Sequence, residues 1–129
     1  MAELVLVDTC IWIPFFNRPQ SREKQALDEL LDDDRVALVG PIVTEILLGF
    51  RRDEQADWVA AELRGIHHVP LSWDDWRGAA QLGRALRAGG HVLPQADLVI
   101  AAVALKNEWR VWTIDPHFDH IPQLRRFPT

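Results

Sequence analysis

The sequence predicts an α/β sandwich with a mainly parallel central sheet. Two observations support this fold class. Short apolar runs within residues 4–7 and 35–40 are continuous rather than alternating, which is typical of strands buried on both faces. Segments with the apolar spacing of helices separate the strand-like runs, and this alternation of strands and helices is typical of a parallel sheet.

The first strand is predicted at residues 4–7, and Asp8 ends it. The stretch CIWIPFF that follows is unusually apolar, and we interpret it as part of a loop that continues to about residue 21. Helical spacing of alanine and leucine then predicts a helix over residues 23–33. The second strand is RVALVG, residues 35–40.

Two helices and a strand are predicted next. Gly40 and Pro41 open a helix, because proline is favoured at the first helical position. The segment DEQADWVAAELRG is a second helix that ends at Gly65. The segment HHVPL predicts a third strand at a sheet end or edge, since Pro70 cannot donate a hydrogen bond within a sheet.

The last part of the chain contains two further helices and a fourth strand. Ser72 and Asp75 form a capping box for the helix WDDWRGAAQLGRALRA, which two glycines end. Pro94 opens a helix that is apolar around most of its circumference, which indicates a central position. RVWTI is the fourth strand and IPQLRRF a short last element. We expect residues 1–129 to form a single domain whose six tryptophans lie mostly in the core.

Composition excludes several kinds of site. The single cysteine, Cys10, excludes an intramolecular disulfide and a cysteine-based zinc site. A formal net charge of -5 argues against binding of nucleic acid through bulk basic charge. The start MAELVLVD lacks the pattern of a signal peptide, and no apolar stretch approaches the ~18 residues that span a bilayer. We therefore expect a cytoplasmic protein with no membrane partner.

Four acidic residues from distant segments are predicted to meet at one edge of the sheet. Asp8 and Asp115 each end a strand, so both lie at the carboxyl edge, where parallel sheets bind ligands. Glu45 and Asp97 lie early in helices that follow prolines, and the first turns of such helices return to the same edge. Each acid alone also has a structural interpretation, as a turn former, a solvent-facing residue or a partner of a helix dipole.

Clustered carboxylates require a compensating cation, because like charges raise one another's pKa and lose hydration. Mg²⁺ or Mn²⁺ suits the cluster, since hard ions prefer carboxylate and water oxygens. The sequence therefore predicts a divalent metal site.

Four motifs, LVDTCIWI, PIVTEILLGF, ADLVIAAVA and VWTIDPHFDHI, occur in the order found in PIN-domain proteins. The chain resembles this family and, more narrowly, the VapC toxins of bacterial type II toxin-antitoxin systems. The resemblance covers Leu4 to about Ile121. It implies a PIN-like three-layer α/β/α sandwich with the activity of a metal-dependent endoribonuclease.

The resemblance also implies the roles of individual residues. The metal-binding and catalytic residues are then Asp8, Glu45, Asp97 and Asp115, with supporting hydroxyls from Thr9 and Thr113. A bound Mg²⁺ or Mn²⁺ lowers the pKa of a water that attacks phosphorus, and a second ion, if it binds, stabilises the leaving oxygen.

One position departs from the family pattern. The family often has a second aspartate two residues after the last conserved one, and here that position is His117. A neutral imidazole suits Mg²⁺ poorly and an imidazolium repels it, so a second metal position is in doubt. His117 is expected to contact a phosphate or to be a partial ligand for Mn²⁺. Asp119 is a secondary candidate that follows in the same segment.

Partners follow from the resemblance and from the surface residues. The family implies a homodimer and a VapB-like antitoxin whose C-terminal segment covers the acid site, and some of Ile11, Trp12, Phe15 and Phe16 line a groove for a partner. RNA is the implied substrate, and candidate phosphate-binding residues are Arg51, Arg84 and Arg87. The alternative is a PIN-fold module that binds RNA or a partner without cleaving, which His117 favours. A phospho-acceptor receiver domain is disfavoured, because a single Asp8 stands where an acidic pair is expected.

Overall fold

The central sheet has five strands in the order β3-β2-β1-β4-β5, and every neighbouring pair is parallel. The computed structural model describes residues 3–128. The strands are β1 (Val5–Val7), β2 (Val36–Leu38), β3 (His67–His68), β4 (Arg110–Trp112) and β5 (Arg125–Arg126). The prediction of a parallel sheet is confirmed, and the short last element proves to be its fifth strand.

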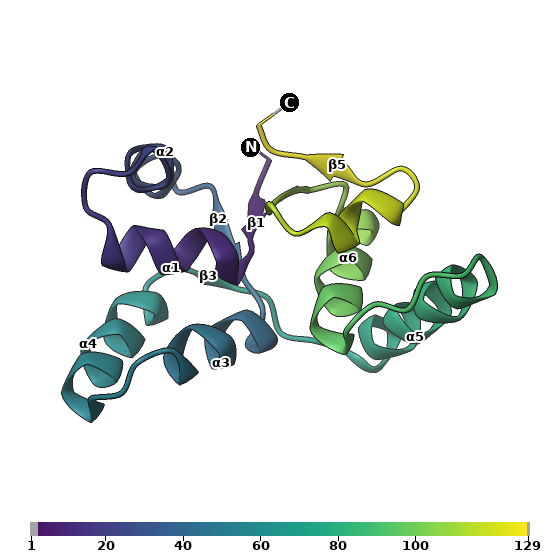
Figure 1. Ribbon diagram of the computed structural model, residues 1–129, viewed down its shortest axis with the longest axis horizontal. Helices are drawn as coiled ribbons and strands as arrows, with labels where there is room; N and C mark the ends of the chain where they lie inside the picture. Colours follow the sequence, from purple (N-terminus) through teal and green to yellow (C-terminus); the bar gives the residue numbers. More distant parts are fainter. Residues whose placement is uncertain (1–2, 129) are drawn as a thin grey trace.

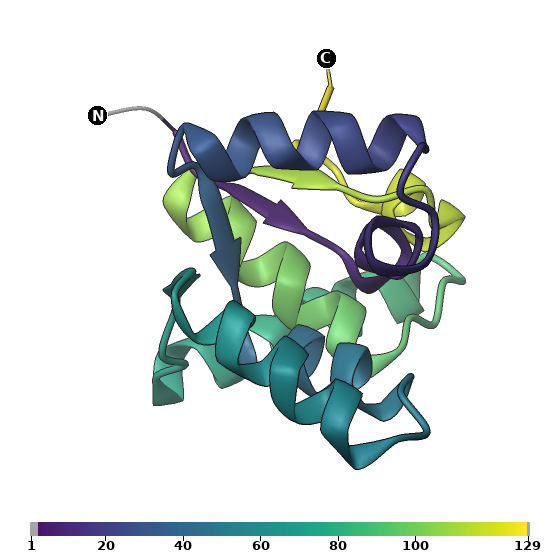
Figure 2. The ribbon, with the colours of Figure 1, turned by 90° about the vertical axis from the view of Figure 1, so that its left-hand side faces the viewer.

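Helices flank the sheet on both sides. Figure 1 shows α1, α2 and α4 on one side of β1 and α5 and α6 on the other, and in Figure 2 the strands β1 and β2 lie in front of α6. The helices are α1 (Thr9–Asn17), α2 (Arg22–Asp32), α3 (Gly40–Leu48), α4 (Asp53–Arg64), α5 (Trp73–Ala88), α6 (Gln95–Asn107) and the 3-10 helix η1 (Pro116–His120). This arrangement is the predicted α/β sandwich.

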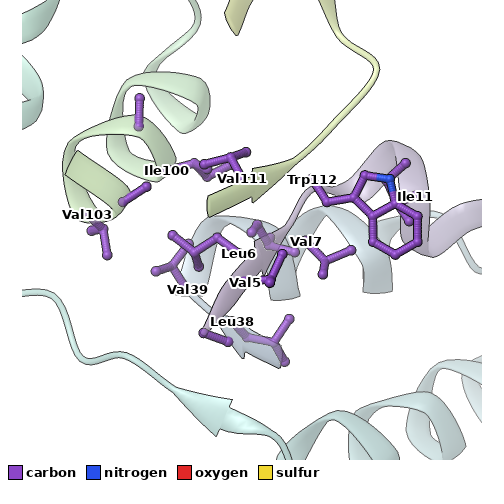
Figure 3. Close-up of a cluster of buried hydrophobic side chains, with 14 of the residues drawn as sticks. Val5, Leu6, Val7, Ile11, Leu38, Val39, Ile100, Val103, Val111 and Trp112 are labelled. Carbon is purple, nitrogen blue, oxygen red and sulfur yellow. The ribbon is translucent and has the colours of Figure 1, made fainter. Parts of the chain in front are cut away.

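The core lies where the middle strands meet α6. All residues of β1 and β2 are buried, as the continuous apolar runs predicted. Ile100 and Val103 of α6 are buried next to Leu6 and Val111 of the sheet (Figure 3). The prediction that α6 is a central helix is therefore confirmed.

The interpretation of CIWIPFF as a loop is wrong, because this stretch forms α1. Asp8 has an extended backbone and caps the helix, so the chain passes directly from β1 into a helix. Trp12 is 1% exposed, and its Nε1 donates to the carbonyl oxygen of Val7 at 3.1 Å. Pro14 inside the helix and the shortness of the segment conceal the helical pattern in the sequence.

The expectation that most tryptophans are core residues is also wrong. Trp12 and Trp112 are buried, whereas Trp109 is half-buried and three others, Trp58, Trp73 and Trp76, are exposed. The three exposed rings belong to α4 and α5, which lie at the outside of the molecule (Figure 1). Each of these peripheral helices buries only one face.

The capping box that opens α5 is confirmed. Ser72 Oγ accepts from the backbone N–H of Asp75 at 3.2 Å, and Asp75 Oδ2 accepts from the N–H of Ser72 at 2.9 Å. Helix α5 then packs closely on α6, since a Cβ at Gly83 would lie 2.8 Å from Leu98 Cδ1. Gly90, with φ 91°, reverses the chain between these helices. Within residues 3–128, no helix has the length and apolar character needed to cross a membrane.

Candidate active site

The carboxyl edge of the sheet brings together the four acids that the sequence singled out. Asp8 follows β1, and the pairing of Val7 with Trp112 places it beside the residue that follows β4. Asp97 lies in the first turn of α6, and Glu45 lies midway along α3. The charges of Asp8 and Asp97 both raise the pKa of Glu45, so these groups lie close enough to interact.

Asp8 is held in place by its own neighbours. Its Oδ1 accepts from the backbone N–H of Thr9 at 2.8 Å, and its Oδ2 accepts from the Thr113 hydroxyl at 2.8 Å. Asp8 is 6% exposed, and each oxygen keeps further lone pairs that can face a ligand. The carboxylate is therefore oriented before any ligand binds.

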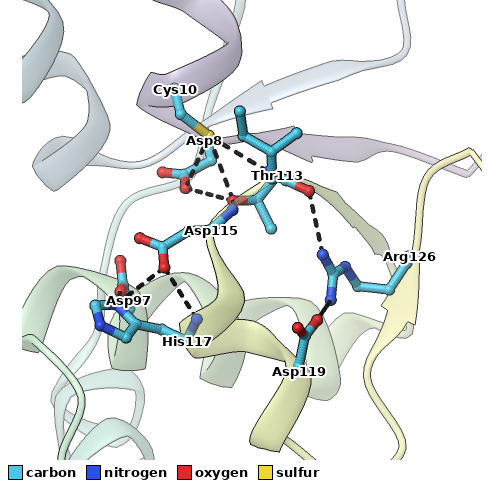
Figure 4. Close-up of polar contacts among 9 residues, drawn as sticks. Asp8, Cys10, Asp97, Thr113, Asp115, His117, Asp119 and Arg126 are labelled. Atoms are coloured by element: carbon cyan, nitrogen blue, oxygen red, sulfur yellow. Dashed lines mark hydrogen bonds and ion pairs between the residues drawn. The ribbon is translucent and has the colours of Figure 1, made fainter.

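The Thr113 hydroxyl connects two of the acids. It donates to Asp8 and accepts from the backbone N–H of Asp115 at 3.0 Å (Figure 4). Arg126 Nη2 donates to the Thr113 carbonyl oxygen at 3.1 Å, so β5 supports the same residue. Arg126 has no motif in the sequence, and only the pairing of β4 with β5 reveals its position.

Cys10 is a second neighbour of the site that the sequence motifs did not assign. Its Sγ lies 3.6 Å from Asp8 Oδ2 and 3.4 Å from Thr113 Oγ1. Burial raises the pKa of the Cys10 thiol, and the Asp8 charge adds to this effect, so the thiol keeps its proton near neutral pH. The sequence feature that could have identified Cys10 is its position in the first helical turn after Asp8.

Asp97, Asp115 and His117 form the tightest cluster, with one ligand atom from each lying within 4.8 Å of the others. His117 Nδ1 lies 2.8 Å from Asp97 Oδ2 and 3.1 Å from Asp115 Oδ1 (Figure 4). Asp115 Oδ1 also accepts the backbone N–H of His117 at 2.9 Å, which fixes the start of η1. His117, the residue that departs from the family pattern, therefore points into the acid cluster, which consists of Asp8, Glu45, Asp97 and Asp115.

The pKa shifts in the site combine desolvation, hydrogen bonding and the mutual repulsion of the acids. Burial raises the pKa of Asp97, the hydrogen bond to His117 lowers it, and the charges of Asp8 and Asp115 raise it again. Glu45 is exposed, but desolvation by the atoms around it raises its pKa, and the charges of Asp8 and Asp97 raise it further. The hydrogen bond to Asp97 raises the pKa of His117, because the carboxylates favour the imidazolium.

Thr9 and Asp119 have different surroundings from those of the cluster. Thr9 is buried, and its Oγ1 has no hydrogen-bond partner within residues 3–128. Asp119 pairs with Arg126 at 3.0 Å and lies on the exposed side of η1, outside the cluster. The hypothesis that Asp119 supports the metal site therefore lacks a geometric basis.

The candidate RNA-binding arginines lie in two separate places. Arg51 is exposed after α3 and lines a cavity of about 690 Å³ with Phe50 and Trp58. Arg84 and Arg87 are exposed on α5 and border a smaller hollow of about 220 Å³. The arginines therefore do not form one continuous patch.

An apolar cavity of about 520 Å³ lies between α1, α2 and α4. Trp12, Phe15, Phe16 and Trp58 contribute aromatic rings to its lining. Phe15 contacts both Trp12 and Phe16 edge-to-face, so the rings form one connected surface. Three of the four residues expected to line a groove thus do so, whereas Ile11 is buried in the core.

Comparisons with known proteins agree with this geometry. Residues 5–124 match the PIN domain family. Ribonuclease VapC11 of Mycobacterium tuberculosis is 29% identical over 125 residues, which cover 94% of this chain and 93% of the relative. Ribonuclease VapC18 of the same organism is 31% identical over 103 residues, which cover 77% of this chain and 75% of the relative.

Solved structures share the fold. VapBC2 from Rickettsia felis, bound to a DNA fragment of its promoter, superimposes with a TM-score of 0.81 at 20% identity, over 95% of this chain and 96% of that chain. The resemblance to PIN-domain proteins and VapC toxins that the four sequence motifs indicated is confirmed. The chain therefore belongs to the PIN-domain family and, within that family, to the VapC ribonucleases.

Proposed function

We propose that this chain is the endoribonuclease toxin of a type II toxin-antitoxin pair and that it cleaves RNA with Mg²⁺ or Mn²⁺. The observation that carries the proposal is the convergence of Asp8, Glu45, Asp97 and Asp115 at the carboxyl edge of the sheet of a VapC-family protein. These four residues would hold the metal. We further propose that residues 1–129 act as one catalytic domain.

The donor set fits a hard divalent ion. Carboxylate oxygens are the ligands that Mg²⁺ and Mn²⁺ prefer, and no thiolate competes, because Cys10 keeps its proton. Desolvation, and after it the charges of neighbouring acids, raise the pKa values of Asp97 and Glu45, and a bound cation would offset both effects. The unpaired Thr9 hydroxyl beside Asp8 offers a further donor to a water or a phosphate oxygen.

A bound divalent ion supplies an acidic water as nucleophile and stabilises negative charge at phosphorus. The chain contributes orientation. Thr113 and the Thr9 N–H hold Asp8 in one rotamer, and Thr113 also fixes the backbone of Asp115. Because these contacts exist before a ligand binds, little conformational entropy is lost when the site is filled.

His117 has a distinct role in this proposal. With its raised pKa it is the internal counter-ion of Asp97 and Asp115 when no metal is bound. It occupies the place where family members often have an aspartate, so it lowers the negative charge available to a second ion. We therefore expect one high-affinity metal position, which titration calorimetry can count.

A VapB-like antitoxin is the proposed protein partner. The aromatic cavity between α1, α2 and α4 suits apolar side chains, and Trp58 at its rim is 61% exposed. The acid cluster would attract a basic side chain of the same partner, which would block the metal site. A homodimer stays a prediction.

The test is cleavage of an RNA panel with Mg²⁺ or Mn²⁺ by wild type, Asp8→Asn and Asp119→Asn. Both variants remove one carboxylate near the ends of the strands, but only Asp8 belongs to the cluster. We expect Asp8→Asn to lose activity and Asp119→Asn to retain it. Full activity of Asp8→Asn would refute the mechanism.

The alternative function is binding of RNA or a partner without cleavage. The pairing of His117 with Asp97 favours it, because an imidazolium in the cluster opposes metal binding. Wild-type protein that binds RNA but cleaves none of the panel with either metal would support this alternative.

A further inference from the structure

Helix α5 has one buried face and one face that is open to solvent. Ala79 and Leu86 are buried, and Gly83 lies against Leu98 of α6. Figure 1 shows α5 at the outer edge of the molecule, with α6 between it and the sheet. The positions of α5 that lie outside this contact, next to Gly83, therefore face solvent.

The open face of α5 combines aromatic and basic side chains. At 3.6 residues per turn, the two tryptophans and three arginines that form this face fall within an arc of about 100°. Trp73 is 80% exposed and Trp76 42% exposed, and all three arginines are exposed. This α5 face consists of Trp73, Trp76, Arg77, Arg84 and Arg87.

The α5 face is basic in an acidic protein. Helix α5 has Asp74 and Asp75 in its first turn, and residues 76–96 then contain three arginines and no aspartate or glutamate, although the formal net charge of the chain is -5. Within residues 3–128, none of these three arginines forms an ion pair. Their guanidinium groups therefore remain available to an external anion.

The α5 face extends toward the acid cluster. Arg84 and Arg87 border a hollow of about 220 Å³ that Val92 and Leu98 also line. Leu98 is the residue after Asp97, so the hollow adjoins the start of α6, where the acid cluster lies. Val92, at the rim of the hollow, is 78% exposed.

We propose that the α5 face binds a single-stranded segment of the substrate RNA and directs it to the acid cluster. The arginines bind phosphates, and the tryptophan rings stack on bases, which is the combination that sequence-tolerant single-strand sites use. The face from Trp73 to Arg87 is about 21 Å long, enough for several nucleotides. This inference rests on the proposed ribonuclease function and assigns the surface that holds the substrate.

Charge complementarity selects RNA over a protein occupant. The carboxylates of the acid cluster repel phosphate, so attraction beyond that of a bound ion must come from elsewhere on the chain. An apolar helix of a partner would cover the two tryptophans but would leave the three arginines without counter-charges. A second copy would set these arginines against three like charges. A polyanion that also carries flat rings satisfies both halves of the face.

The test measures RNA affinity in an Asp8→Asn background, so that cleavage does not deplete the probe. The probe is a fluorescent single-stranded RNA of about twelve nucleotides, and anisotropy is recorded over a range of salt concentrations with Mg²⁺ present. Arg84→Ala/Arg87→Ala is compared with Arg22→Ala/Arg64→Ala, which removes the same charge from exposed positions on α2 and α4.

We expect the α5 double variant to bind at least about tenfold more weakly, with a salt slope smaller by about 1.4, since each single-strand phosphate contact contributes about 0.7. The control double variant should bind like its parent. Trp73→Leu should weaken binding about fivefold or more, and Trp73→Phe should retain most of the affinity, because only a ring can stack on a base.

Several results would overturn the inference. These are equal binding by the two arginine double variants, equal affinity of Trp73→Leu and Trp73→Phe, selective loss of duplex DNA binding, or loss of self-association in Trp73→Leu. The two proposals are separable. Wild type that cleaves while the α5 variants bind normally refutes this inference alone, and wild type that never cleaves while the α5 variants lose RNA binding refutes the ribonuclease function alone.

Discussion

Asp75 and Asp97 occupy equivalent places in two neighbouring helices, yet their environments are opposite. Each lies in the first turn of its helix, and they are 7% and 8% exposed. The pKa of Asp75 is lowered, whereas the pKa of Asp97 is raised. The comparison therefore holds residue type and surface exposure nearly constant, and the neighbours differ.

Donors and a cation surround Asp75. The N–H and hydroxyl of Ser72 donate to its carboxylate, and Lys106 Nζ lies 3.1 Å away. The hydrogen bond from the Ser72 N–H is the largest cause of its lowered pKa. Such an acid is satisfied within the fold and has a structural role.

Within residues 3–128, His117 is the only favourable partner of Asp97, and other acids lie nearby. Burial and the charges of Asp8 and Asp115 outweigh that one hydrogen bond. A buried carboxylate that the fold leaves undercompensated is typical of a functional site. The difference teaches that surface exposure alone does not separate a structural carboxylate from a catalytic one, because the partners of the acid decide whether the fold compensates its burial.

The largest expected effect is on RNA cleavage. Replacement of a residue that only orients a metal ligand costs up to about 100-fold, so loss of a ligand should exceed that. We therefore expect Asp97→Asn to lower kcat/KM by more than about 100-fold. Asp75→Asn removes the same charge from an equally buried aspartate and should leave kcat/KM within about twofold at temperatures where it is folded. Comparable losses in both variants would break the comparison.

The next largest effect is on stability, and here we expect the Asp75 variant to lose more than the Asp97 variant. Asp75→Ala removes half of the capping box and the partner of Lys106, so it should lower the free energy of unfolding by about 1–2 kcal/mol and Tm by several degrees. Asp97→Asn should raise the Tm of the metal-free protein, because it removes a repelled charge. Thermal unfolding in a chelating buffer measures both, with Lys106→Gln as a milder control for Asp75→Ala.

Metal affinity should respond to His117. His117→Asp removes the competing cation and adds a carboxylate next to Asp97, so the Mg²⁺ midpoint should fall by about tenfold, or about 1.4 kcal/mol. His120→Asp adds the same charge to an exposed position on η1 whose ring stacks on His91. Titration calorimetry distinguishes the two, and an equal gain in both variants would mean that general charge, rather than the position of His117, sets the affinity.

The smallest expected effect is the pH dependence of stability without metal. Asp97, Glu45 and His117 all have raised folded-state pKa values, so each binds protons more tightly in the folded than in the unfolded chain. Their stabilising contributions are complete below the unfolded values, about 4 for the acids and about 6.5 for histidine, and disappear as the pH rises through the folded values. Tm should therefore fall with rising pH in a chelator, and saturating Mg²⁺ should reduce this slope.

Local sequence patterns predicted much of the fold and the outline of the site. Asp8 and Asp115 follow apolar strands, and Asp97 follows Pro94, so the carboxyl-edge rule was sufficient to predict their convergence. The same reasoning did not find Cys10 or Arg126, because the contacts of both residues with Thr113 depend on how β4 pairs with β1 and β5. It also misassigned α1, whose Pro14 resembles the end of a regular element.

The sequence by itself determined the alternation of strands and helices, the capping box of α5 and the family, since each rests on residues near one another in the chain. Only the tertiary structure decided that His117 reaches Asp97, that Asp119 turns away to Arg126, and that the tryptophans of α5 face solvent. The physical reason is that these outcomes depend on how helices and strands pack. A histidine has a raised pKa only when the fold places a carboxylate beside it, and a helix has an open face only when no other element covers it.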